Sequence, residues 1–136
     1  MSAPQGGTVK FYDPQRAPDS AKWLALDDDE KRMLVEKYHQ AKRLTAPNTI
    51  MHAVLHVVVE NQIAERFDPT VRAMARLRNE DLSRHDALHA VGCVVLEHLS
   101  ELIRKKGKDL AGTSEGALAA ALDRLTVDEW HRRYGG

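Results

Sequence analysis

Apolar residues recur every three to four positions in several segments, which is the spacing of one face of an α-helix. The first such segment is predicted to be a helix from about Asp27 to Arg43, because Asp27 and Glu30 have the spacing of a capping box. Residues 20–26 are expected to add a short turn of helix before it. The apolar face of the main helix would contain Met33, Leu34, Tyr38 and Ala41.

The segment from Thr49 to about Arg66 is apolar on most sides, which is typical of a central helix. Its run Val57-Val58-Val59 has high β propensity, and periodicity alone leaves a strand open as an alternative. Length favours the helix, because this run without a turn signal is much longer than a usual strand of about five or six residues.

Two helices are predicted to follow. Asp68-Pro69 has the pattern of an N-cap followed by proline in the first turn, and it would begin a shorter, more polar helix. Ser83 would cap a long helix that continues to about Lys106 and stops at Gly107.

Two smaller helices are predicted near the C-terminus. The segment from Ser114 to Leu125 carries an apolar stripe at helical spacing, and Thr126 with Glu129 would cap a last turn. The whole pattern predicts an all-α fold, a compact helical bundle of about five to six helices joined by short connections.

The chain is predicted to have one domain preceded by a flexible arm. Residues 1–19 are rich in proline and glycine and have no apolar periodicity, so they read as an extended N-terminal arm that Phe11 and Tyr12 could pin to a groove. Residues 20–136 would form the single helical domain, which is long enough to bury its own core.

The candidate chemistry lies in two His-x-x-x-His pairs, His52 with His56 and His85 with His89. Residues four apart lie on the same face of a helix, so each pair projects two imidazoles in one direction. The two helices are expected to run roughly parallel, with Gly92 permitting close approach. Four converging neutral imidazoles would suit one transition-metal ion, with zinc, iron, copper and nickel all open.

Two acidic residues are candidates for supporting the histidines by hydrogen bonds without binding the metal themselves. Glu60 continues the first histidine stripe and is expected to orient an imidazole by a hydrogen bond, and Asp86 could act similarly or cap its helix. Cys93 is expected to be an inert apolar filler. Three further histidines have no partner at helical spacing and are predicted to lie on the surface: His39, His98 and His131.

A second hypothesis assigns the histidines no metal. They would then form a hydrogen-bonded polar core or a dimer seam in a non-enzymatic protein-interaction or dimerisation module. Enzymatic activity is left open, because the sequence contains neither a phosphate-binding glycine-rich loop nor another familiar catalytic motif.

The composition limits the classes of partner that the protein is expected to bind. Lys and Arg number 20, as do Asp and Glu, so the net charge is zero and nucleic acid is not an expected partner. No uninterrupted apolar run is long enough to predict a membrane span, and no secretory signal is recognisable. The single cysteine fits a reducing compartment, so a cytoplasmic protein is expected, with the metal ion as its main partner and a homodimer as an option.

The region from about Pro47 to Leu99 resembles a bacterial family known as domain of unknown function 1841. The resemblance lies in His52-x-x-x-His56, the following Asn61-Gln62-Ile63, and His85-x-x-x-His89. It implies a helical bacterial protein in which the four histidines recur as a set, and it implies no activity. The chain departs from the family pattern at Asn61, where a glutamate is expected and Glu60 stands one position earlier, about 100° around the helix.

Overall fold

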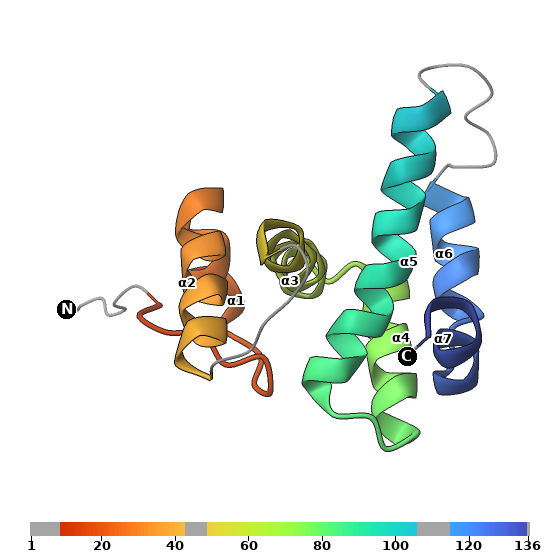
Figure 1. Ribbon diagram of the computed structural model, residues 1–136, viewed down its shortest axis with the longest axis horizontal. Helices are drawn as coiled ribbons and strands as arrows, with labels where there is room; N and C mark the ends of the chain where they lie inside the picture. The colour runs from red at the N-terminus through yellow and green to blue at the C-terminus, as the bar shows by residue number, and fades with distance from the viewer. Residues whose placement is uncertain (1–8, 43–48, 106–114, 136) are drawn as a thin grey trace.

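The computed structural model describes residues 9–42, 49–105 and 115–135. Within these ranges all regular secondary structure is helical, which confirms the predicted all-α fold (Figure 1). The described helices are α1 (Ser20–Leu24), α2 (Asp28–Ala41), α3 (Thr49–Ala64), α4 (Asp68–Asn79), α5 (Arg84–Lys105), α6 (Glu115–Asp123) and α7 (Val127–Tyr134).

The predicted caps explain where several helices begin. Asp27 accepts a hydrogen bond from the Glu30 backbone N–H at 2.8 Å, and the Glu30 side chain accepts one from the Asp27 N–H at 2.9 Å. This reciprocal capping box satisfies two amides that the start of α2 would otherwise leave unpaired. Thr126 caps α7 through the Glu129 N–H. The segment with three valines is helical, so length was the better guide there.

Helix α4 begins differently from the prediction. Asp68 is already helical, the N-cap is Phe67, and no side chain caps the helix. The preceding turn has Arg66 with φ of 60°, a left-handed conformation that ends α3 without glycine. The Phe67 N–H then reaches back to the Gln62 carbonyl at 2.9 Å, which satisfies one of the last carbonyls of α3.

The histidine helices α3 and α5 cross instead of running parallel. In Figure 1, α3 is seen nearly end-on while α5 runs across the view, with α4 and α6 beside it and α1 and α2 on the opposite side of α3. The prediction of parallel helices was therefore wrong, because loop length limits which helices are neighbours and leaves their crossing angle to packing. The two histidine pairs meet where the helices cross.

A glycine allows this crossing. A methyl group added at Gly92 of α5 would lie 2.3 Å from Cγ of Leu55 on α3, far inside van der Waals contact. A close contact at Gly92 is confirmed, but the prediction that the partner backbone makes it was wrong, because the nearest atoms belong to the Leu55 side chain. Replacing this glycine would require the Leu55 side chain to shift.

Two hydrophobic cores lie on either side of the crossing. The first, called here the apolar core, is formed mainly by α4, α5, α6 and α7, and its fully buried members include Leu77, Leu88 and Leu122. The second, called the aromatic core, lies between the N-terminal segment, α1, α2 and α3, and includes Tyr12, Trp23 and Val35. Helix α3 contributes to both, which explains why it is apolar on most sides.

The described part of the N-terminal arm, residues 9–19, has no helix and is packed onto the domain. Tyr12 is 4% exposed and Pro14 is fully buried, whereas Phe11 is 79% exposed. The expectation that Tyr12 pins this segment is confirmed, and the same expectation for Phe11 was wrong. Residues 1–8 of the predicted arm lie outside the described residues.

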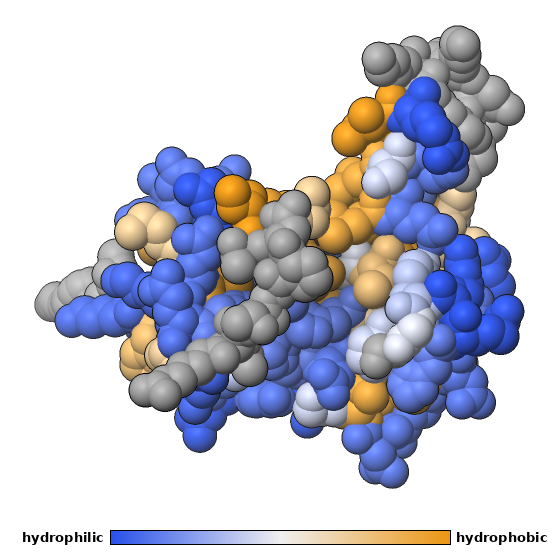
Figure 2. All heavy atoms as spheres, in the orientation of Figure 1, coloured by the Kyte–Doolittle hydropathy of each residue, from blue (hydrophilic) through white to orange (hydrophobic). Residues whose placement is uncertain are grey.

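Some apolar residues remain on the surface. Figure 2 shows hydrophobic side chains along the upper end of α5, where Leu99 and Ile103 are exposed. None of the described helices combines the length and apolar character needed to cross a membrane.

Candidate metal centre

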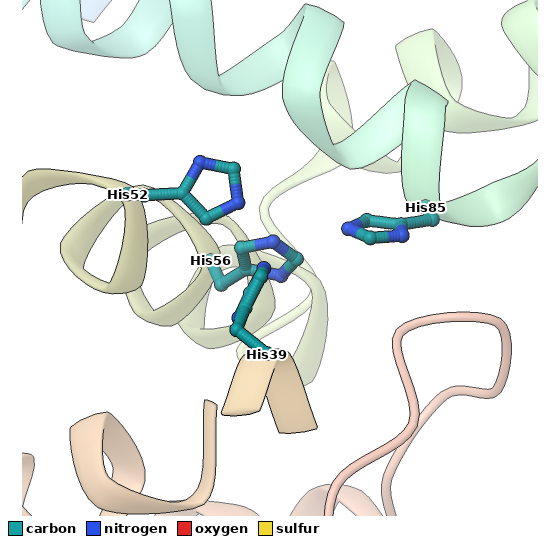
Figure 3. Close-up of side chains that lie close together, drawn as sticks. All are labelled: His39, His52, His56 and His85. Atoms are coloured by element: carbon teal, nitrogen blue, oxygen red, sulfur yellow. The ribbon is translucent and has the colours of Figure 1, made fainter. Parts of the chain in front are cut away.

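Four histidines from three helices surround one space. His39 comes from α2, His52 and His56 come from α3, and His85 comes from α5 (Figure 3). Each offers a ring nitrogen, and these four atoms all lie within 4.8 Å of one another. The chain is thus a small helical protein with a histidine cluster that can hold a metal ion.

His89 adjoins this group. Its Nε2 lies 3.1 Å from Nε2 of His56, and its ring centroid is 4.6 Å from that of His52 and 4.5 Å from that of His85. The structure therefore brings together all four histidines that the sequence singled out. It adds a fifth, because the ring centroid of His39 lies only 4.5 Å from that of His52.

The prediction that His39 lies on the surface was wrong. It rested on the lack of a second histidine at helical spacing, which tests only chelation within one helix. His39 reaches the others because α2 packs against α3, and that contact is tertiary. His98 and His131 are not among the residues that form the described cluster, and His131 is exposed.

Two imidazole nitrogens in the cluster are buried and have no hydrogen-bond partner among the described residues: Nε2 of His39 and Nε2 of His85. The other nitrogen of His39, Nδ1, lies 2.8 Å from the Val35 carbonyl, which can only accept, so Nδ1 carries the proton. In the neutral imidazole, Nε2 of His39 is then the nitrogen with the lone pair. An unpaired buried polar atom costs about 1–3 kcal/mol, which a bound ion would offset.

A series of buried hydrogen bonds, called here the polar chain, links His56 to Tyr12, Glu60 and Arg84. Nδ1 of His56 lies 3.0 Å from the Tyr12 hydroxyl, which donates a hydrogen bond of 2.6 Å to Glu60. Both oxygens of Glu60 accept hydrogen bonds of 2.8 Å from Arg84. His56 is fully buried, and Glu60 and Arg84 are 1% and 7% exposed, so the chain is shielded from water.

The N-terminal segment also contacts the start of α5. Arg84 donates to the carbonyl of Pro14 at 2.9 Å and to that of Arg16 at 3.4 Å. The backbone N–H of His85 donates to the side chain of Gln15 at 3.3 Å. These bonds join the segment to the same helix turn that carries His85.

Four of the histidines are held in the neutral form that metals bind. Burial, followed by the nearby imidazoles, lowers the pKa of His52 to about 4 and that of His89 to about 3. The pKa of His56 is lowered further for the same reasons, and burial also lowers the pKa of His85. Neutral imidazoles bind a metal without first losing a proton to solvent.

The two acidic residues predicted to support the histidines, Glu60 and Asp86, behave differently. Glu60 makes no direct hydrogen bond to an imidazole among the described residues and reaches His56 only through the Tyr12 hydroxyl. Asp86 is exposed, and its backbone N–H donates to Ser83 Oγ at 3.1 Å, which is a capping bond. Its charge partly opposes the lowering of the His85 pKa by burial.

Cys93 lies apart from this chemistry. It packs against the apolar core, and burial raises the pKa of its thiol. A raised pKa disfavours the reactive thiolate, in keeping with the predicted role as apolar filler.

Sequence reasoning missed two residues of the polar chain as site residues, Tyr12 and Arg84. Tyr12 was recognised only as an anchor for the arm, and its position 44 residues before His56 carries no helical periodicity. Arg84 directly precedes His85, and its buried partners, Glu60 and the Pro14 carbonyl, lie far from it in the sequence. Neither role has a local sequence signal.

Comparison with known proteins identified no matching family model, curated protein or solved structure.

Proposed function

We propose that this protein binds one first-row transition-metal ion through His52, His56, His85 and His89, with His39 as an additional ligand. The observation that carries the proposal is that two buried Nε2 atoms, of His39 and His85, have no hydrogen-bond partner in the described part of the chain. Both residues belong to the group of four histidines that each have one ring nitrogen within 4.8 Å of the others. A hydrogen-bonded polar core would instead give each buried nitrogen a partner.

The donor set supports late transition metals. Imidazole nitrogen suits zinc, iron, copper and nickel, whereas magnesium and calcium prefer oxygen ligands. The nearest buried carboxylate, Glu60, is engaged by Arg84 and Tyr12 and is not free to ligate. The proposed ion therefore has a nitrogen-only protein environment.

One distance supports a shared ion for the two helices. His56 and His89 have their Nε2 atoms 3.1 Å apart. Two nitrogens that each bind one metal at about 2.1 Å lie at most about 4.2 Å apart, so both could contact the same ion. In the metal-free protein the same contact is a hydrogen bond, and the ion would replace the shared proton.

The number of ligands decides what the ion can do. Four protein ligands close a tetrahedral ion, which favours a structural or sensing role. An open position on the ion would permit a bound water and hydrolytic or redox chemistry.

We also propose membership of the family known as domain of unknown function 1841, on the histidine spacing alone.

Elemental mass spectrometry of protein purified without a polyhistidine tag tests the proposal. The native protein is expected to contain close to one ion per chain, and a variant with His52, His56, His85 and His89 changed to alanine is expected to contain none. His39→Ala should lower the metal content or affinity, and His131→Ala, an exposed histidine outside the cluster, should match the native protein. Absence of metal after reconstitution with zinc, iron, copper and nickel would contradict the proposal and favour a polar core.

A further inference from the structure

We infer that Tyr12 is a positioning residue of the histidine site, which selects Nε2 of His56 as the metal donor and couples metal binding to docking of residues 9–16. This inference rests on the proposed function. Its structural basis is the buried chain from Arg84 through Glu60 and Tyr12 to His56.

The first step concerns the direction of the hydrogen bonds. Both oxygens of Glu60 accept from Arg84, and an ionised carboxylate has no proton to donate. The Tyr12 hydroxyl must therefore donate its only proton to Glu60, at 2.6 Å. Its oxygen is left as an acceptor for the imidazole of His56.

The second step concerns the tautomer of His56. Nδ1 lies 3.0 Å from a hydroxyl oxygen that can only accept, so Nδ1 carries the proton. Nε2 is then the unprotonated nitrogen, and it is the one that faces His89. The polar chain thus directs the Nε2 lone pair of His56 toward the cluster before any ion binds.

The third step concerns how firmly the Tyr12 hydroxyl orients the His56 ring. Metal-binding imidazoles commonly donate their second N–H to a carboxylate, which orients the ring and raises its basicity. Here a tyrosine stands between the imidazole and the carboxylate and extends the same arrangement by one residue. Packing leaves the Tyr12 ring little freedom, since its centroid lies 5.6 Å from that of Trp23 and 5.7 Å from that of His56.

The fourth step connects the site to the N-terminal segment. Tyr12 belongs to residues 9–16, which also supply the carbonyls of Pro14 and Arg16 to Arg84 and the side chain of Gln15 to His85. An ion that favours the oriented His56 favours the docked segment, and the docked segment raises the affinity for the ion by the same factor.

Tyr12→Phe tests the inference, because it keeps the packed ring and removes only the hydroxyl. Long-range ¹H–¹⁵N NMR of the metal-free protein is expected to show the Nδ1–H tautomer of His56 in the native protein and a shift toward Nε2–H in the variant. In a zinc titration, the variant should bind about 10–100-fold more weakly than the native protein. Tyr38→Phe is the matched control, since its ring packs edge-on against His39 and His85.

Hydrogen exchange of the native full-length chain tests the coupling. Zinc should increase protection of the amides in residues 9–16, and the increase should be smaller in Tyr12→Phe. An unchanged His56 tautomer together with native zinc affinity in Tyr12→Phe would overturn the inference. So would equal protection with and without bound zinc. Failure of the native protein to bind zinc or another tested ion would instead reject the proposed function, and the tautomer measurement would still decide whether Tyr12 controls His56.

Discussion

The two cores of this protein are stabilised by different interactions. The apolar core contains packed aliphatic side chains such as Leu77, Leu88 and Leu122, all fully buried. The aromatic core borders the histidines and the buried Glu60–Arg84 pair. Aliphatic packing contributes stability without needing directed partners, whereas each buried polar group needs its own partner to avoid a desolvation cost. The comparison indicates a division between a stabilising half and a half arranged around the site.

The largest expected effect is in the polar chain. Arg84→Ala would leave the Glu60 carboxylate buried without its cation, and removing one partner of a buried pair costs about 3–5 kcal/mol. Urea denaturation measures this loss. Arg72→Ala breaks an ion pair with Asp123 whose side chains are 53% and 47% exposed, and it should cost less than about 1 kcal/mol. Similar losses in the two variants would contradict the described burial of the Glu60–Arg84 pair.

A truncation in the apolar core should separate stability from metal binding. Leu77→Ala removes a fully buried side chain and should lower the free energy of unfolding by about 2–5 kcal/mol. Metal content per folded chain should stay at the native value, because Leu77 on α4 is not part of the histidine cluster. Elemental analysis measures the metal content, and circular dichroism measures the folded fraction. Loss of metal from the folded variant would show that the two halves are not independent.

Acidification should act mainly through the histidine side. The folded-state pKa values of His52 and His89 are lowered to about 4 and about 3 by burial, whereas these histidines titrate near 6.5 when unfolded. The unfolded chain therefore binds more protons below about pH 6.5, and the stability of the metal-free protein should fall as pH decreases from there toward 4.

The slope of this loss is at most about 1.4 kcal/mol per pH unit for each such histidine. Both histidines are partly exposed, so screening by solvent lowers the slope below this limit. Urea denaturation between pH 7.5 and 5 checks the prediction. A variant with His52 and His89 changed to glutamine should have a flatter dependence, and an equally steep one would place the titrating groups elsewhere.

A smaller effect than those of Arg84→Ala and Leu77→Ala is expected at the crossing between the two halves. Gly92→Ala would place a methyl group 2.3 Å from Leu55 Cγ, and overpacking of this kind costs about 1–3 kcal/mol despite the better helix propensity of alanine. Thermal denaturation measures the loss. Adding Leu55→Ala should recover part of it by vacating the space, and a double variant no more stable than Gly92→Ala would show that the clash is not with Leu55.

Local signals predicted much of the fold. The capping box of Asp27 with Glu30, the Thr126 cap and the two histidine pairs are all local patterns, and each is present in the structure. Such patterns are readable because the interacting residues lie within one or two helical turns of one another.

The remainder of the site depends on tertiary packing. His39 joins the cluster only because α2 packs on α3, and the crossing of α3 and α5 depends on how Gly92 and Leu55 fit together. Tyr12 and Arg84 enter through hydrogen bonds to Glu60 that span 48 and 24 residues. Periodicity along one helix contains no information about such partners.

The span of these contacts also sets when the site can form during folding. The Arg84 bond to the Pro14 carbonyl joins residues 70 positions apart, so closing it carries the entropic cost of a long loop. A folding intermediate that contained only the apolar core would hold His85 and His89 but lack the oriented His56. Such an intermediate, and any nascent chain that has not yet emerged as far as Arg84, would bind the ion weakly. Metal occupancy would therefore indicate that the chain has folded completely. A bound ion would also stabilise the fully folded protein more than it stabilises partly folded forms.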